Sequence, residues 1–399
     1  MTTTSHTTGR SGDGLVGGLK GLLEDPRVGA TGREIAHQPA MWRQVGADVA
    51  ARREEIDRFL TPLLVHGDLR IVLTGAGTSA FVGQLLAPAL TRVLRRRVEA
   101  VATTDIVSNP QDAFAEDVPT LLVSFARSGD SPESVAATVL ADQLLASVHH
   151  MVVTCNADGQ LAHTHGEAER SLVLLMPPGT NDEGFAMTSS FTSMVLATWL
   201  ALAPAGEPGA DLAGRIADAG DAVLATRSDA VAELVRRRYE RVVYLGSGPL
   251  TGLARESALK VLELSAGAVV SYFDSALGFR HGPKSVVDAS TLAVVFLSND
   301  AYTRRYDEDI ARELRQQMGD ANVVVLAARP ADGADGTWTV PGLDDAPDVL
   351  LALPYVLVAQ LFALGTSLSL GLVPDSPSPS GQVNRVVQGV TVHPYQQGS

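Results

Sequence analysis

The feature that most constrains the fold of this chain is an internal repeat with a constant spacing. Residues 70–77 (Arg-Ile-Val-Leu-Thr-Gly-Ala-Gly) resemble residues 241–248 (Arg-Val-Val-Tyr-Leu-Gly-Ser-Gly), which lie 171 positions further on. Three more matches have the same spacing: the apolar runs that start at Thr120 and Thr291, the runs 151–154 and 322–325, and the helical stretches that Phe191 and Phe362 open. A repeat this long exceeds the length of solenoid repeats, so it indicates a duplicated domain.

Each copy of the repeat consists of short apolar runs that alternate with helical patterns. This alternation is typical of a parallel sheet with helices on both faces. We therefore predict an α/β fold with two tandem, doubly wound, flavodoxin-like domains. The expected divisions are an N-terminal extension with a short helix at 1–44, a first domain at 45–205, a second domain at 215–375, and a C-terminal loop and tail at 376–399.

Local patterns also predict helices ahead of the first strand. Thr31-Gly-Arg-Glu34 has the spacing of a capping box, so a short helix is expected to begin there and to end at Pro39. Apolar residues at helical spacing then predict one helical stretch over residues 41–65. The proline-rich and glycine-rich segment 203–209 is expected to join the two domains.

Charge and cysteine content exclude several classes of partner. The chain has 45 acidic and 31 basic side chains, so nucleic acid is not expected as a partner. The N-terminus lacks the pattern of a signal peptide, and no run of about 18 apolar residues predicts a membrane span. Cys155 is the only cysteine and follows an apolar run, so we expect a buried thiol in a cytoplasmic protein.

Two turns that follow predicted strands are rich in small and hydroxyl side chains. The first, residues 75–79, opens a helix whose free N–H groups could bind an anion. The second, residues 127–131, places Ser131 at a helix cap before Pro132. Ordinary capped turns are the alternative, but adjacent turns favour one shared phosphate site. Its expected residues are Gly77, Ser79, Arg127, Ser128, Gly129 and Ser131.

The second copy of the repeat carries a different set of polar residues. Glu256, Lys260 and Glu263 are spaced i, i+4, i+7 and therefore share one helix face. A solvated stripe is the alternative interpretation, but the flanking residues are apolar and the chain has only three lysines. His281 follows in a Gly-Pro turn beside Lys284, and imidazole is well suited to proton transfer near neutral pH.

Other chemistries receive less support from the sequence. The histidines are not spaced with carboxylates as zinc ligands would be, so no metal site is expected. Neither glycine-rich turn has the Gly-Lys-Ser/Thr of a P-loop, and the Gly-x-Ser-x-Gly elbow of many hydrolases does not occur.

Together these motifs resemble the sugar isomerase (SIS) superfamily over about residues 31–395. The motifs that carry the resemblance are Glu34-Ile-Ala-His-Gln-Pro39, Gly75-Ala-Gly-Thr-Ser79, Ser128-Gly-Asp-Ser131, the helix at 256–263 and Arg280-His-Gly-Pro283. Residues 279–284 and 377–389 are narrower signatures and resemble the AgaS-type galactosamine-6-phosphate deaminase/isomerases, also called tagatose-6-phosphate ketose/aldose isomerases. The resemblance implies that both domains are SIS domains.

The resemblance also implies roles for the candidate residues. Ser79, Ser128 and Ser131 would hold the sugar phosphate. Glu263 would move the proton between C1 and C2, and Lys260 would stand near the reacting oxygens. His281 of a neighbouring subunit would open the sugar ring. The expected reaction yields tagatose 6-phosphate and ammonia from galactosamine 6-phosphate, without a metal or other cofactor, in a homodimer or larger homo-oligomer.

Departures from the relatives leave two other functions open. The isomerase half of glucosamine-6-phosphate synthase has serine and glutamine at the positions of Ala126 and Arg127, and a lysine at the position of Gln388. One alternative is aldose–ketose isomerisation of hexose 6-phosphates without ammonia release. The other is a sugar-phosphate-binding regulator, which would be expected to lack Glu263 or His281; both residues are present.

Overall fold

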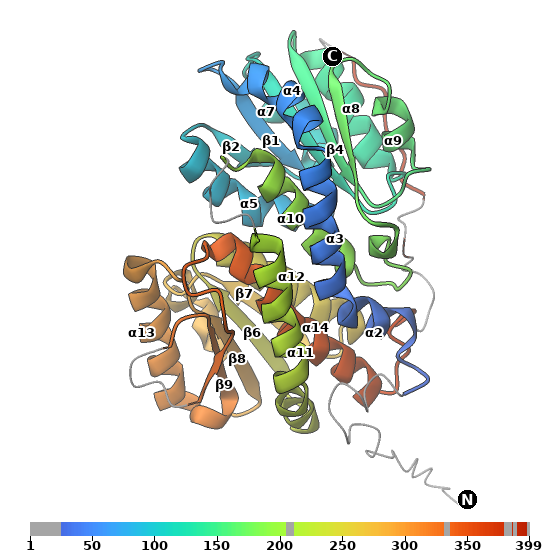
Figure 1. The fold of residues 1–399 in the computed structure, drawn as a ribbon. Helices are drawn as coiled ribbons and strands as arrows, with labels where there is room; N and C mark the ends of the chain where they lie inside the picture. The colour runs from blue at the N-terminus through green and yellow to red at the C-terminus, as the bar shows by residue number, and fades with distance from the viewer. Residues whose placement is uncertain (1–24, 205–210, 331–335, 379–384, 386–388, 397–399) are drawn as a thin grey trace, which may run out of the picture.

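Two five-stranded parallel sheets form the framework of the computed structural model, which describes residues 25–204, 211–330, 336–378, 385 and 389–396 (Figure 1). The first sheet has the order β2-β1-β3-β4-β5. Its strands are β1 (Arg70–Thr74), β2 (Val98–Ala100), β3 (Thr120–Ala126), β4 (Val148–Thr154) and β5 (Ser171–Leu175). This order is that of flavodoxin-like folds.

The second sheet repeats this order when it is followed from its other edge, as β7-β6-β8-β9-β10. Its strands are β6 (Arg241–Gly246), β7 (Val270–Asp274), β8 (Thr291–Phe296), β9 (Val323–Ala327) and β10 (Thr337–Thr339). All strand pairs in both sheets are parallel. The predicted fold of two tandem, doubly wound α/β units is therefore confirmed, whereas the exact domain boundaries remain a prediction.

The register of the strands tests the spacing of the repeat. Arg70 pairs with Thr120, and Arg241 pairs with Thr291, so the spacing of 171 holds for these strands. It does not hold further along, because Val123 pairs with Met151 whereas Val294 pairs with Val324, a spacing of 173 between β4 and β9. The predicted alignment of 151–154 with 322–325 is thus wrong by two residues. The longer connection between β8 and β9 accounts for the difference.

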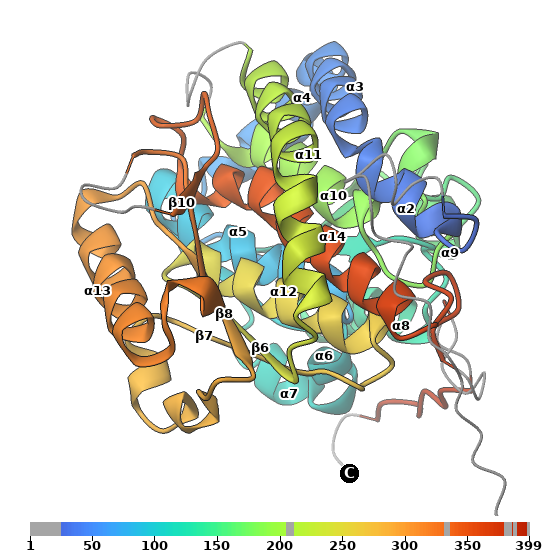
Figure 2. The same ribbon diagram turned by 90° about the horizontal axis from the view of Figure 1, so that it is seen from below.

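In the described part of the chain, six helices of 14 or more residues fill the space between the two sheets (Figure 2). They are α3 (Gln38–Ala51), α5 (Thr78–Leu94), α10 (Ser189–Leu202), α11 (Leu212–Arg236), α12 (Pro249–Leu264) and α14 (Asp348–Ser369). Helix α14 has the length and hydropathy of a membrane-spanning helix, but its most apolar window is entirely buried among the other helices, so it serves as a core helix. Phe191 lies at the start of α10, whereas Phe362 lies well inside α14 and does not open it.

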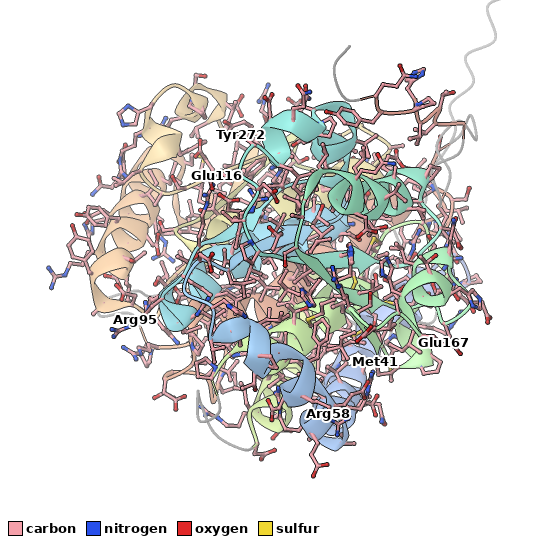
Figure 3. All side chains as sticks on the ribbon, turned by 90° about the horizontal axis from the view of Figure 1, so that it is seen from above. Met41, Arg58, Arg95, Glu116, Glu167 and Tyr272 are labelled. Carbon is pink, nitrogen blue, oxygen red and sulfur yellow. The ribbon has the colours of Figure 1, made fainter. Side chains whose placement is uncertain are left out.

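Shorter elements cover the outer faces of the sheets. The first sheet is covered by α6 (Thr103–Ser108), α7 (Pro110–Ala113), α8 (Pro132–Leu144) and α9 (Gln160–His165). The second is covered by α13 (Ala301–Met318) and by 3-10 turns at Gly278–Arg280, Pro283–Val286 and Asp320–Asn322. A further 3-10 turn, Pro178–Thr180, lies in the loop before α10. Charged side chains such as Arg58, Arg95 and Glu167 project from the rim (Figure 3).

The N-terminal helices differ from the sequence prediction. Helix α2 (Gly29–Ala36) starts before Thr31, whose N–H and hydroxyl both donate to Asp375, at 2.8 and 2.7 Å, so Thr31 is not a helix cap. Pro39 lies in the first turn of α3 and does not end a helix. The expected single stretch over 41–65 is divided at Arg52 between α3 and α4 (Arg53–Leu64). Most of the predicted joint at 203–209 lies outside the described residues.

Helices α5 and α12 cross in close contact at the centre of the molecule. A side chain at Gly252 would lie 2.8 Å from the backbone nitrogen of Leu85, so only glycine allows this approach. Next to it, the Nη1 atom of Arg255 donates to Oε1 of Gln84 at 3.0 Å. Positions 84 and 255 are 171 residues apart, so equivalent positions of the two copies meet here. This contact joins the polar face of α12 to the first sheet.

Candidate active site

The turn between β1 and α5 is so tight that two of its positions require glycine. Gly77 has a φ of +56°, a conformation that other residues adopt only with strain. A side chain at Gly75 would lie 2.6 Å from the backbone of Ser79, so the turn also requires glycine there. Ser79 is buried in the first turn of α5, with its Oγ 3.9 Å from Sδ of Met187. The N–H groups of Ser79 and Ala80 already donate to the carbonyl oxygens of Ala76 and Gly77. The hydroxyls of Thr78 and Ser79 and the positive end of the α5 dipole are therefore what this helix end offers an anion.

The turn between β3 and α8 lies at the same edge of the first sheet, because β1 and β3 are neighbours. Gly129 has a φ of +75°, and the backbone N–H of Asp130 donates to Oγ of Ser128. Pro132 begins α8, which confirms the prediction. Ser131 occupies the cap position, but within the described chain its hydroxyl makes no capping bond. It therefore keeps its hydrogen-bonding capacity for another group.

The polar face of α12 meets the first turn through Lys260. The Nζ atom lies 3.0 Å from Oγ1 of Thr78, 2.7 Å from Oε2 of Glu263 and 3.3 Å from Oε1 of Glu256. Lys260 and Glu256 are fully buried and Glu263 is mostly buried, so the three residues are not a solvated stripe. Thr78 belongs to the glycine-rich turn that the sequence pattern predicts, but the pattern does not predict its contact with Lys260.

Burial and neighbouring charges shift the pKa values of Glu256 and Lys260. Desolvation raises the pKa of Glu256 to about 7, against the opposing effect of the Lys260 ammonium. Desolvation would lower the pKa of Lys260, but the two neighbouring carboxylates outweigh it and raise that pKa. Lys260 therefore stays charged, and it presents a fixed positive charge between the α12 carboxylates and the glycine-rich turn.

Arg127 uses its guanidinium to hold other parts of the chain. Its Nη1 donates to the carbonyl oxygens of Gly184 and Phe185 at 3.4 Å, and its Nη2 donates to the carbonyl oxygen of Arg385. Desolvation, followed by the nearby Arg385, lowers the pKa of Arg127. The side chain thus ties the second turn to the loop before α10 and to the C-terminal segment. Direct binding of a phosphate by Arg127 remains a prediction.

Three carboxylates position α2 and the loop before α10. Asp182 caps α10 by accepting from the N–H groups of Thr188 to Ser190. Glu34 accepts from the N–H of Gly184, and Asp375 holds the start of α2. Burial, followed by the neighbouring Asp182, raises the pKa of Glu34 to about 7. These roles were not predicted from the sequence, where the motif that begins with Glu34 is the signal that points to this region.

His281 lies on the opposite face of the second sheet from Glu263. Its neighbour Phe279 is fully buried in the core cluster that α13 forms with Val243, whereas α12 belongs to the core on the other face. The His281 side chain is exposed and makes no hydrogen bond to any described residue. A single chain therefore does not bring His281 and Glu263 into one site.

Other candidate chemistry is limited in the part of the chain that the structure describes. No group of three or more His, Cys, Asp or Glu residues there is arranged to hold a metal ion. Cys155 is buried, and desolvation raises the pKa of its thiol to about 12, so it is not a nucleophile. Gln388 and most of the 377–389 signature lie outside the described residues.

Comparison with known proteins relates this geometry to one family. The SIS domain model matches residues 63–204. A protein of Streptomyces coelicolor that bears the AgaS name is 58% identical over 370 residues, which cover 91% of this chain and 95% of the relative. The D-galactosamine-6-phosphate deaminase AgaS of Escherichia coli is 46% identical over 378 residues, which cover 93% of this chain and 98% of the relative.

A solved structure agrees with these relatives. The crystal structure of tagatose-6-phosphate ketose/aldose isomerase from Escherichia coli superposes with a TM-score of 0.84 at 43% identity. The match covers 92% of this chain and 97% of that chain, so it includes both sheets.

Proposed function

The chain belongs to the AgaS family of SIS-domain proteins, and from this premise we propose that it is a deaminase and isomerase of amino-sugar phosphates. The proposed reaction converts galactosamine 6-phosphate and water into tagatose 6-phosphate and ammonia. The observation that carries the proposal is the placement of Lys260, which lies between the Glu263 carboxylate and the glycine-rich turn that opens α5. This arrangement puts a proton-transfer group beside an anion-binding helix end.

The two turns of the first sheet would hold the phosphate. Two helix N-termini and the hydroxyls of Ser79, Ser128 and Ser131 supply hydrogen-bond donors for an anion. Binding the phosphate at one end of the open-chain sugar fixes its carbon chain relative to α12. Such orientation lowers the entropic part of the barrier.

Acid and base groups would then move the protons. His281 of a second subunit opens the sugar ring, and Glu263 takes the proton from C2 and returns it to C1. As C2 loses its proton, negative charge develops on O1, which the Lys260 ammonium stabilises, and O1 takes a proton from water to give the enolamine. Protonation at C1 then turns the former aldehyde into the hydroxymethyl group of the ketose and leaves an imine at C2. Water adds to this imine and releases ammonia.

A dimer with shared sites is part of the proposal. The surface that separates Glu263 from His281 includes exposed apolar side chains at Leu262, Val270 and Leu277. Val270 begins β7, the edge strand of the second sheet. Apolar side chains along an unpaired strand edge favour a protein contact. A two-fold contact here would bring His281 of each chain toward Glu263 of the other.

We also propose a cytoplasmic location, since the one cysteine is a buried free thiol and α14, the helix of membrane-spanning length among the described residues, is a core helix.

An ammonia-release assay across hexosamine 6-phosphates tests the reaction directly. The expected result is release of one ammonia per ketose 6-phosphate from galactosamine 6-phosphate. Parallel assays with tagatose 6-phosphate and other neutral hexose phosphates test plain isomerisation. Isomerisation of these sugars with no ammonia from any hexosamine phosphate would contradict deamination and support the isomerase alternative. Binding of sugar phosphates without turnover would support the regulator.

A further inference from the structure

The loop that carries His281, residues 278–286, is held by one carboxylate of α13. The Nε atom of Arg280 donates to Oε2 of Glu313 at 2.9 Å. Lys284 donates to the other carboxylate oxygen, Oε1. Glu313 thus binds one cation on each side of His281. Lys284 is one of only three lysines in the chain, and another of them is Lys260.

The main chain of this loop is fixed while the imidazole is left free. Phe279 is fully buried, and Nη1 of Arg280 donates to the carbonyl oxygen of Ala276 at 3.1 Å. Gly282 has a φ of +121°, which directs the chain away from His281 into the next turn. The His281 side chain has no hydrogen-bond partner among the described residues. The loop is therefore built to present an imidazole outward at a defined place.

Helix α13 is itself firmly docked, which gives Glu313 a fixed position. Asp307, fully buried on this helix, accepts from Oγ of Ser247 at 2.5 Å and from the N–H of Ser298 at 3.0 Å. Asp300 caps its first turn by accepting from the N–H groups of two residues. The carboxylate that holds the loop is therefore tied to the carboxyl ends of β6 and β8.

We infer that Glu313 is a positioning residue for the proposed reaction, acting through His281. The inference rests on the proposed function, in which His281 opens the sugar ring. Partly exposed ion pairs contribute little to folding stability, so the loss of Glu313 should loosen the loop without unfolding the protein. Catalysis is more sensitive, because misplacing a reacting group by 1 Å can cost about 100-fold in rate.

The test is a double-mutant cycle between Glu313→Gln and His281→Ala. In the wild-type background, Glu313→Gln is expected to lower kcat about 5-fold to 50-fold. The KM should change less than about two-fold, since the phosphate turns belong to the other sheet. In the His281→Ala background, Glu313→Gln should have no further effect. Glu313→Asp, which keeps the carboxylate, should lower kcat less than Glu313→Gln does.

Asp309→Asn is the matched control. It removes one acidic charge from the same helix and breaks an exposed ion pair with Arg312, but it does not touch the loop. This variant should behave as wild type in kcat, KM and melting temperature. If Asp309→Asn and Glu313→Gln lower kcat equally, the effect comes from the charge of the helix and the inference is overturned.

The outcomes also separate this inference from the proposed function. A wild-type protein that releases no ammonia from hexosamine phosphates overturns the proposed function itself. If the wild type is active and His281→Ala is impaired, an unchanged Glu313→Gln overturns only the inference. An equal loss from Glu313→Gln in both backgrounds also overturns it, because the residue would then not act through His281.

Discussion

At the scale of single residues, the difference in burial between two carboxylates favours Glu263 over Glu256 as the proposed proton-transfer group. Glu256 is fully buried against Lys260, whereas 23% of the Glu263 side chain is exposed. Both carboxylates compensate the buried ammonium, which would otherwise be costly to desolvate. Only Glu263 is open to a substrate, so it is the candidate base, and Glu256 holds Lys260 in place.

Replacing Glu263 by glutamine should remove the proton transfer and leave binding intact. General acid–base catalysis contributes about 10²-fold to 10⁴-fold, so kcat should fall by that factor. The KM should change little, because the phosphate contacts remain. Steady-state ammonia release measures both constants. Glu233→Gln, on the exposed side of α11, is the control and should match wild type. Full activity in Glu263→Gln would contradict the assignment.

Replacing Ser128 and Ser131 together by alanine should weaken substrate binding. Each hydroxyl that no longer reaches the phosphate removes a charge-assisted hydrogen bond, so we expect KM to rise about 10-fold or more. Inorganic phosphate, tested as a competitive inhibitor, should lose affinity in parallel. If the double variant binds phosphate and substrate like wild type, the anion lies elsewhere.

At the scale of elements, the two copies of the glycine-rich turn have the same backbone conformation, but different groups lie against them. Gly77 and Gly248 share φ and ψ within a degree, at +56° and −128° in the first copy and +57° and −128° in the second. In the second copy, Pro249 lacks an N–H group, and the Asp307 carboxylate bridges Ser247 and the N–H of Ser298. The protein's own carboxylate therefore closes the second turn, and only the first is open to a phosphate.

The protonation of Asp307 should be visible in stability. Desolvation raises its pKa to about 7, so the folded protein binds a proton there that the unfolded chain releases near pH 4. The contribution of Asp307 to stability therefore falls as pH rises toward 7. Relative to Asp307→Asn, the free energy of unfolding of wild type should drop by about 2 kcal/mol between pH 5.5 and pH 7 and level off above about pH 8.

Denaturant unfolding of both proteins across this pH range measures the difference. Glu34 and Glu256, whose pKa values are also raised, are present in both proteins and cancel in the comparison. Asp348, whose charge raises the pKa of Asp307, contributes to the difference between the two proteins. Parallel pH profiles for the two proteins would contradict the prediction.

Elements were predictable from sequence where local pattern and burial agree. The strands at 70–74 and 241–246 are apolar and follow one repeat, so both their existence and their spacing were correct. The start of α2 was not predictable, because the partner of Thr31 is Asp375, 344 positions away. The same holds for Glu34, which accepts from the N–H of Gly184, 150 positions away.

At the scale of the whole molecule, the duplication explains why the site needs both copies. The layers run from outer helices through one sheet, the shared helical centre and the second sheet to α13 (Figures 1 and 2). The crossing of α5 and α12 at Gly252 brings Lys260 of the second copy to Thr78 of the first. His281 faces outward on the far side of the second sheet, so the proposed reaction would use His281 of a further chain.

Mixing two inactive variants tests whether sites are shared between chains. In a hybrid of Glu263→Gln and His281→Ala chains, sharing places both substitutions in one site and leaves the other site intact. Random mixing in a dimer makes half of the molecules hybrids, so about a quarter of wild-type activity should return. If each chain forms its own site, every site keeps one substitution and no activity returns. Refolding the chains together, with each variant alone as control, separates these outcomes. Activity in a strictly monomeric wild-type protein would also contradict the shared site.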